Sequence, residues 1–277
     1  MNRITLLLAL ACLVSFVSFS LAATQPLLNA KESKVLVFSK TAGFRHGSIP
    51  QGIKAIKELG ISNGWKVDAT EDASAFTAKN LAKYKAVIFL NTTGDVLNDE
   101  QQKAFEDYIR AGGGYMGIHS AADTEYDWPF YGELIGGAYF KGHPRVQKAT
   151  VIVEDQTFPA TKMLPKKWER TDEWYVYRES PRKRRGVVVV ASLDESSYQG
   201  GGMNGDHPIA WYREYEGGRA FYTGGGHTNE SFSEPLFREH LTQGVRWTAG
   251  LEKTPPKKAT PAEDLPKTRK KAPASGS

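Results

Sequence analysis

Cysteine is almost absent from this chain of 277 residues, since Cys12 is the only one. Cys12 lies in an apolar N-terminal stretch that we expect to be cleaved off. The mature protein would then have no thiol, which excludes disulfide bonds and a cysteine nucleophile. Without cross-links the protein must be stable through its core, and a chain of this length is long enough to bury one.

Long apolar runs are also missing, except at the N-terminus. Residues 1–22 combine one early basic residue, Arg3, with an apolar stretch from Ile4 to Val17 and the small-residue pattern Ser20-Leu21-Ala22. This pattern predicts a secretory signal peptide, and therefore a secreted or periplasmic protein with no stable membrane insertion after cleavage. The alternative is an uncleaved anchor, because residues 4–23 are about long enough to span a bilayer.

The central part of the chain has no excess charge of either sign. The chain carries 36 Lys and Arg against 31 Asp and Glu, and most of the net charge of +5 lies in residues 251–277. A nucleic-acid-binding domain needs basic charge on its own surface, so we expect no nucleic-acid partner. Residues 251–277 are rich in Lys and Pro and show no apolar periodicity, which predicts a disordered tail.

Between these ends, short apolar runs alternate with segments of helical spacing. The expected strands cover residues 34–38, 65–69 and 86–90 and a run that ends at His119; the expected helices cover residues 50–63, 78–82 and 98–110. Repeated strand–helix units predict an α/β fold with a parallel sheet and right-handed crossovers. Further strands are expected at residues 149–154, 187–192, 209–215 and 220–223, before a last helix over residues 235–249.

The most informative motif runs from Gly112 to Asp123, where three glycines lead into a strand that stops at His119. Ligands of parallel sheets bind beyond the carboxyl ends of the strands, so His119 stands where such a fold does its chemistry. The small residues that follow resemble a helix start, whose N–H groups can bind an anion. His227 follows Gly224-Gly225-Gly226 in a similar setting. The alternative for both histidines is a hydrogen-bonded structural role.

Two loops hold further candidates for substrate binding. Arg45 and His46 follow the first expected strand, and the planar Arg45 side chain suits an anionic or hydroxyl-rich group. The dinucleotide fingerprint G-x-G-x-x-G is absent there. Asp206 and His207 precede Pro208 in a second loop. Either loop is otherwise an ordinary surface turn.

Carboxylates stand beside aromatic residues in two segments, at Asp172-Glu173-Trp174-Tyr175 and around Asp123, Asp127 and Trp128. Such pairs suit the hydroxyls and faces of sugars, and paired carboxylates are the usual apparatus of glycoside cleavage. The alternative is exposed acids beside core aromatics.

The six histidines show no H-E-x-x-H spacing, and His240 is expected to be structural because it lies inside the last helix. We expect no organic cofactor. A divalent metal held by His46, His119, His207 or His227 stays open, because ligands that are distant in sequence can converge in space.

Six motifs taken together resemble the ThuA-like (trehalose-utilisation) family over residues 33–250. They begin at Phe38, Gly112, Gly142, Thr171, Gly205 and Gly218, and include Gly142-His-Pro and Gly218-Arg-Ala-Phe-Tyr-Thr-Gly-Gly-Gly-His. The resemblance implies the class I glutamine amidotransferase-like fold, a flavodoxin-like three-layer α/β sandwich with a mostly parallel central sheet. In amidotransferases of this fold a cysteine occupies the turn where this chain has His119, and His227 resembles their later histidine. Without the thiolate, glutamine hydrolysis is excluded.

The resemblance also implies carbohydrate metabolism. We expect an enzyme that acts on a glycoside or keto-sugar, by hydrolase or by lyase or isomerase chemistry, because an imidazole titrates near neutral pH. The expected catalytic residues are His119, His227, Asp172 and Glu173; the expected substrate-binding residues are Arg45, His46, Ser120, Asp123, Trp128, Asp206 and His207. The alternative is a non-catalytic carbohydrate-binding or accessory protein, and a flavin electron carrier is a remote third hypothesis.

Overall fold

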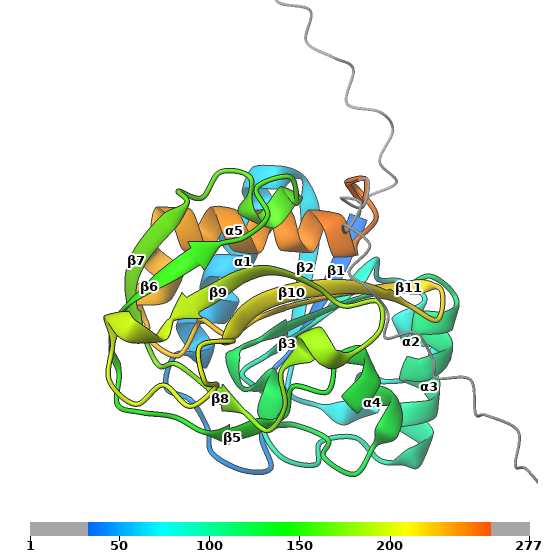
Figure 1. Cartoon of the computed structure of the whole chain (residues 1–277). Coiled ribbons are helices and arrows are strands. Elements are labelled where there is room, and N and C mark those ends of the chain that lie inside the picture. Colours follow the sequence, from blue (N-terminus) through cyan, green and yellow to red (C-terminus); the bar gives the residue numbers. More distant parts are fainter. Residues whose placement is uncertain (1–32, 256–277) are drawn as a thin grey trace, which may run out of the picture. The chain divides into compact units, whose positions relative to one another are not determined.

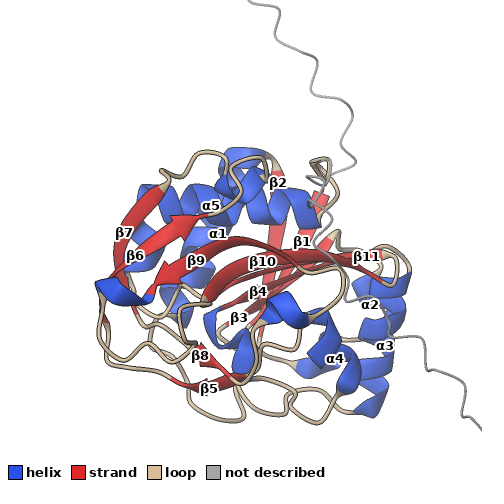
Figure 2. Ribbon diagram, in the orientation of Figure 1, coloured by secondary structure: helices blue, strands red, loops and turns tan. Residues whose placement is uncertain are grey.

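The computed structural model describes residues 33–255. The expected signal peptide and the larger part of the expected tail lie outside the described residues. The described part forms a central sheet of nine strands in the order β2-β1-β3-β4-β11-β10-β9-β6-β7, with helices on both faces (Figure 1, Figure 2). This arrangement confirms the expected three-layer α/β sandwich.

Five neighbouring strands are parallel, and four antiparallel strands extend the sheet. The parallel strands are β1 (Ser33–Phe38), β2 (Trp65–Thr70), β3 (Ala86–Leu90), β4 (Gly114–Ile118) and β11 (Gly218–Thr223). The extension comprises β10 (Pro208–Tyr215), β9 (Val188–Asp194), β6 (Gln147–Val153) and β7 (Lys167–Asp172). Each antiparallel pairing reverses direction, so β7 runs the same way as β4 and β11. The carboxyl ends of these three strands therefore share one edge. A separate ribbon pairs β5 (Phe140–Gly142) with β8 (Val176–Tyr177).

Helices α1 (Ile49–Asn63) and α5 (Pro235–Thr248) cover one face of the sheet, and α2 (Ala78–Leu81), α3 (Asp99–Arg110) and α4 (Pro129–Leu134) cover the other (Figure 1). The sequence signals at the helix ends act as expected. Gly64 closes α1 in the left-handed region at φ 76°, and Asn98 and Gln101 form a capping box that opens α3. Short 3₁₀ turns cover Ala73–Ala75, His119–Asp123, Pro159–Thr161, Pro181–Lys183, Glu195–Ser197 and Glu230–Ser233.

Alternating side chains of the parallel strands supply two cores, one on each face of the sheet. In β1, Val35 and Val37 pack on the side of α1 and α5, whereas Leu36 and Phe38 pack on the side of α2, α3 and α4. All four are almost completely buried. A strand that is buried on both faces reads as a continuous apolar run, which is why these strands were visible in the sequence.

Helix α4 and strands β5 and β8 were not predicted, and two further differences bear on the site. The small residues after His119 form only the five-residue 3₁₀ turn His119–Asp123, not the start of an α-helix, so they offer no helical anion site. Strand β7 was not predicted, although its side chains alternate between buried and exposed. Two of its three buried positions are Arg170 and Asp172, which bury charge as an ion pair and so hide the apolar period.

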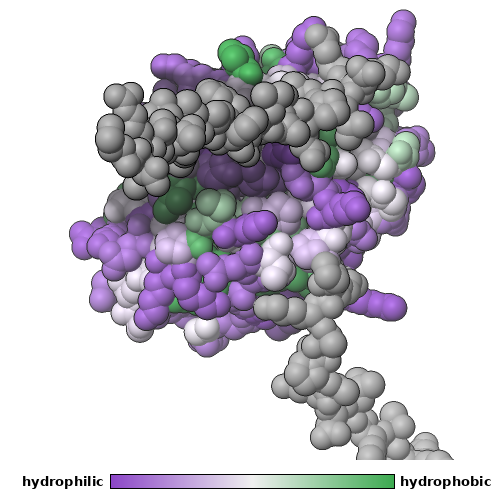
Figure 3. Space-filling model, turned by 90° about the horizontal axis from the view of Figure 1, so that it is seen from above, coloured by the Kyte–Doolittle hydropathy of each residue, from purple (hydrophilic) through white to green (hydrophobic). Residues whose placement is uncertain are grey.

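Where residues are coloured in Figure 3, the face is mostly hydrophilic with scattered hydrophobic residues. Across residues 33–255, the large apolar side chains that are exposed are Phe44, Ile61, Val146, Met163 and Leu251. None of the helices in this range is both long enough and apolar enough to span a bilayer.

Candidate functional site

Three histidines and one carboxylate meet at the carboxyl edge of the sheet. His46 lies in the loop after β1, His119 directly follows β4, His227 follows β11 and Glu173 follows β7. One nitrogen or oxygen from each side chain lies within 4.8 Å of the others. We call these four residues the histidine–glutamate cluster. The two histidines singled out from the sequence are in contact within it, with His119 Nε2 at 3.3 Å from His227 Nδ1.

His119 is held in an unusual backbone conformation. Its φ of 50° lies in the left-handed region, which costs free energy for any residue with a Cβ. The ring is completely buried, and its Nδ1 lies 3.0 Å from the carbonyl oxygen of Gly224. A carbonyl only accepts, so the proton of a neutral His119 ring sits on Nδ1 and the lone pair of Nε2 faces the cluster. Strain at a buried polar residue is typical of functional sites.

Glu173 joins the two histidines. Its Oε2 lies 3.4 Å from His119 Nε2 and 3.2 Å from His227 Nδ1, and its Oε1 lies 3.0 Å from His143 Nδ1. Burial acts to raise the pKa of Glu173, but its contacts with His119 and His227 outweigh burial and lower the pKa below its usual range. Glu173 is therefore a carboxylate at neutral pH. Burial acts to lower the pKa of His227, and the hydrogen bond and charge of Glu173 outweigh this effect and raise it.

Asp172 fixes the backbone on which Glu173 and His227 stand. It is completely buried, and its Oδ1 accepts hydrogen bonds from the backbone N–H groups of Glu173 at 3.0 Å and His227 at 3.1 Å. Its Oδ2 accepts from the N–H of Gly226 at 2.8 Å and pairs with Arg170 at 3.1 Å. The end of β7 is thereby attached to the loop after β11.

His46 forms the inner wall of the cluster. Its ring stands edge-on to those of His119 and His227, with centroids 4.9 and 5.2 Å away, and its Nδ1 lies 3.3 Å from Ser120 Oγ. Burial, together with the nearby His119 and His227, lowers the pKa of His46 to about 3, so this ring is neutral under ordinary conditions. The ring of Phe44 stands edge-on to that of His46, with centroids 4.9 Å apart, and Phe44 is 67% exposed.

The remaining candidates from the sequence lie around or away from the cluster. Asp123 accepts a hydrogen bond from Tyr126, and burial raises the pKa of its carboxyl. Arg45 does not point into the cluster, since its guanidinium forms a bidentate pair with Glu71 at 2.8 and 2.7 Å.

Trp128, Asp206 and His207 have structural partners of their own. Trp128 is buried among the aromatic side chains beside α3 and donates to Glu106. Asp206 accepts from Ser180 and Arg182. His207 is buried against Glu195 and Tyr198, and its Nε2 lies 2.7 Å from the carbonyl oxygen of Tyr175. His207 is thus outside the group of possible metal ligands.

The sequence did not assign a role to two residues that contact the cluster. His143 reaches Glu173 from the loop after β5, and in the sequence it stood only in the motif Gly142-His143-Pro144 of the family resemblance. The ring of Tyr175 lies 4.2 Å from that of His119. Nothing in the periodicity of the chain separates either residue from ordinary loop and core residues.

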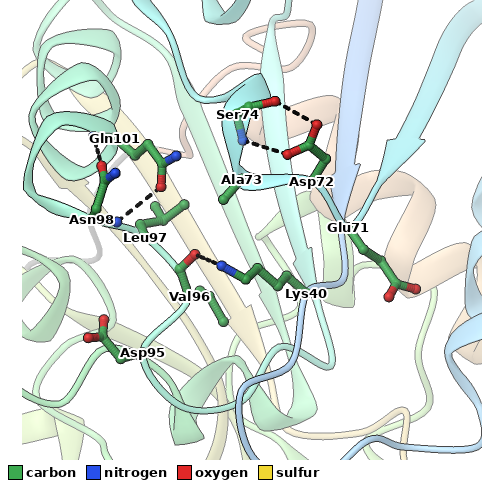
Figure 4. Close-up of a pocket in the computed structure, with 10 residues that line it drawn as sticks. All are labelled: Lys40, Glu71, Asp72, Ala73, Ser74, Asp95, Val96, Leu97, Asn98 and Gln101. Atoms are coloured by element: carbon green, nitrogen blue, oxygen red, sulfur yellow. Dashed lines mark hydrogen bonds between the residues drawn. The ribbon is translucent and has the colours of Figure 1, made fainter.

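A concavity lies at the same edge, beyond β1, β2 and β3. It has a volume of about 510 Å³ and is lined by Lys40, Glu71–Ser74, Asp95–Asn98 and Gln101. Figure 4 shows that its polar side chains mostly bind one another or nearby backbone, as Lys40 does with the carbonyl of Val96 and Asp72 with Ser74. Because these groups serve local turns and the cap of α3, this pocket is a weaker candidate than the cluster.

Comparison with known proteins agrees with the fold. The structure is similar to that of a ThuA-like protein from Bacteroides uniformis, with 27% identity, a TM-score of 0.69 and coverage of 81% of this chain and 95% of that one. A ThuA-like protein from Parabacteroides merdae gives 20% identity, a TM-score of 0.66 and coverage of 86% and 94%. No curated protein matches the sequence.

A more distant likeness concerns the fold alone. A β-galactosidase from Bacillus circulans sp. alkalophilus gives 12% identity and a TM-score of 0.52, with coverage of 79% of this chain and 31% of that one. The family comparison is more specific, because residues 34–248 match the family described as "Trehalose utilisation". The chain therefore belongs to the ThuA family.

Proposed function

We propose that this protein is an enzyme of carbohydrate metabolism that acts on a glycoside or keto-sugar, with the histidine–glutamate cluster as its active centre. The observation that carries the proposal is the contact of His119, His227 and Glu173 at 3.2 to 3.4 Å, on a strained turn at the carboxyl edge of the sheet. The family description supports the substrate class. Cysteine chemistry has no residue to carry it, since Cys12 is the only cysteine and lies far from this edge in sequence.

The exposure of the three side chains assigns them different roles. The His227 side chain is 25% exposed, whereas those of Glu173 and His119 are 7% and 0% exposed. His227 is therefore the group that exchanges a proton with substrate, and Glu173 and His119 orient it and balance its charge. In a keto-sugar the C–H bond beside the carbonyl is acidic, so a positioned base and a group that polarises the carbonyl suffice for elimination or isomerisation.

Two exposed residues that contact the cluster suit a sugar. The exposed ring of Phe44 offers an apolar face against which the C–H face of a pyranose can pack. His143, whose side chain is 42% exposed, offers a polar group on the outer side of Glu173. The sugar would then lie between an aromatic face and the imidazole of His227.

The test is turnover of trehalose, its 3-keto form and common disaccharides by purified protein, with products followed by NMR. We expect H227A and E173Q to lose at least about 100-fold in kcat/KM, which is the usual contribution of a positioned acid or base. H240Q is the matched control, because His240 is buried in α5 and bonds Ala160 and Thr223 outside the cluster. Saturable binding without product would favour the accessory-protein alternative, and full activity in both variants would remove the cluster from the mechanism.

We also propose that the protein acts outside the cytoplasm, from the pattern of residues 1–22 alone. Mass spectrometry of the N-terminus after expression in a secreting host tests this. A mature chain that begins near residue 23 supports the proposal, and an intact Met1 in the cytoplasmic fraction contradicts it.

A further inference from the structure

The spacing of the ligand atoms in the histidine–glutamate cluster is that of a metal centre. His119 Nε2, His227 Nδ1 and Glu173 Oε2 form a nearly equilateral triangle with sides of 3.3, 3.2 and 3.4 Å. In a tetrahedral site with metal–ligand bonds of about 2.0–2.1 Å, neighbouring ligand atoms stand about 3.3 Å apart. A divalent ion above this triangle would reach all three atoms with little movement of the side chains.

The outer hydrogen bonds of the histidines also fit a metal site. His119 donates through Nδ1 to the carbonyl of Gly224, and His46 contacts Ser120 through Nδ1. Partners of this kind fix the orientation of a ring so that the other nitrogen faces the ion, and they accompany most histidine ligands. Asp172 holds the backbone of His227 and Glu173 in the same way.

Three atoms that can each bind a cation converge in the cluster. With Nδ1 directed at the carbonyl of Gly224, His119 turns its Nε2 to a carboxylate oxygen 3.4 Å away and to His227 Nδ1 at 3.3 Å. Within residues 33–255, the ion pairs of Glu173 are with His119, His143 and His227, and none is with Lys or Arg. A buried carboxylate without a permanent positive partner is costly, and a divalent ion removes that cost.

We propose that His119, His227 and Glu173 bind one divalent first-row transition-metal ion, with His46 as the fourth ligand, and that Zn²⁺ fits the spacing. Three imidazoles and one carboxylate suit the borderline-soft ions of this series, whereas Ca²⁺ and Mg²⁺ prefer oxygen ligands. The inference deepens the proposed function: the ion, expanding to five-coordinate, would polarise a carbonyl or hydroxyl oxygen of the sugar beside Phe44, and His227, bound through Nδ1, would exchange protons with substrate through Nε2. Metal binding itself does not depend on the substrate.

The test is metal content and metal affinity of the full chain, independent of turnover. Protein purified without chelator is analysed by mass spectrometry of metals, stripped, and titrated with Zn²⁺ alone by calorimetry. Co²⁺ is then substituted as a spectroscopic probe. We expect about one Zn²⁺ per chain and intense visible bands of tetrahedral Co²⁺. E173Q and H119Q should weaken Zn²⁺ binding by at least about 100-fold, more than the 10–100-fold typical of second-shell changes.

Two control variants keep the outcome decisive. H240Q and H207Q remove buried histidines outside the cluster and should bind Zn²⁺ like the original protein. Folding of every variant is checked by circular dichroism, and H227A provides a second test if H119Q does not fold. Failure of the stripped protein to bind Zn²⁺, Co²⁺, Mn²⁺ or Fe²⁺, or equal loss in H240Q and E173Q, overturns the inference. Turnover of a sugar by metal-free protein would overturn the catalytic role of the metal, but it would leave the proposed function standing. Tight metal binding without turnover of any sugar would count against the proposed function alone.

Discussion

Replacement of Asp172 by alanine should destabilise the protein strongly, because this carboxylate is completely buried and serves several donors at once. It accepts hydrogen bonds from the N–H groups of Glu173, Gly226 and His227 and pairs with Arg170. Removal of one partner of a buried ion pair costs about 3–5 kcal/mol. Arg170 keeps Glu234 at 3.0 Å, so we expect a loss near the lower end, about 3 kcal/mol. That is a large fraction of the 5–15 kcal/mol by which a typical domain is stable.

The assay is urea unfolding at pH 7, followed by tryptophan fluorescence. E169A is the matched control, because Glu169 lies on the same strand but pairs with Lys148 at the surface, with side chains 61% and 64% exposed. Exposed pairs of this kind contribute less than about 1 kcal/mol. If D172A does not fold, D172N retains one acceptor oxygen, and its loss should be about 1–3 kcal/mol. A loss in both Asp172 variants no larger than that of E169A would refute the reasoning.

Three further changes test the core and the electrostatics. G114A places a Cβ 2.1 Å from the carbonyl oxygen of Thr248 and should lower Tm. G142A is the control, because a Cβ there meets no atom within 4 Å, and equal Tm values for the two variants would contradict the predicted clash. F158A removes a ring stacked 4.2 Å from that of Tyr212 and should cost about 3–5 kcal/mol in urea unfolding, against about 0.5 kcal/mol or less for M163A at an exposed position. Burial raises the pKa of Glu125 from its ordinary 4.5 to about 7. The folded state therefore binds this proton more tightly than the unfolded state, and the free energy of unfolding falls as the pH rises from 4.5 to about 7. E125Q should reduce that fall by up to about 3 kcal/mol, and an unchanged pH profile of stability would contradict this prediction.

The parallel half of the fold could be predicted because each signal was local. Strands β1, β3 and β4 are buried on both faces and read as apolar runs, and Gly64 and the pair Asn98 and Gln101 mark helix ends. Strand β7 could not be predicted in this way. Its inward positions include Arg170 and Asp172, whose burial depends on partners far away in the sequence.

The residues of the candidate site could likewise be predicted only in part. His119 and His227 were found because each follows a strand, and the carboxyl ends of parallel strands share an edge. Strands β4 and β11 are neighbours because of the topology of the whole sheet. In the sequence, only the family resemblance indicated that His119 and His227 lie together. Glu173 was proposed as a catalytic residue because aromatic residues stand beside it in the sequence. Its contact with both histidines depends on the direction of β7 in the sheet, which no local sequence pattern predicts. His207 is equivalent to the other candidates in sequence, but its ring is bound to Glu195 and to the carbonyl of Tyr175, away from the cluster.

The backbone of His119 argues that its imidazole is there for chemistry and not for packing. A left-handed conformation costs a residue with a Cβ about 1–2 kcal/mol, and glycine would avoid that cost, as the neighbouring turns with glycine at positive φ do. The ring is also buried, and although it packs against Tyr175, its Nε2 faces a carboxylate oxygen and another imidazole, which packing alone does not require. Backbone strain together with a buried nitrogen that faces other polar atoms is what a centre prepared for a proton, a cation or a reacting oxygen requires.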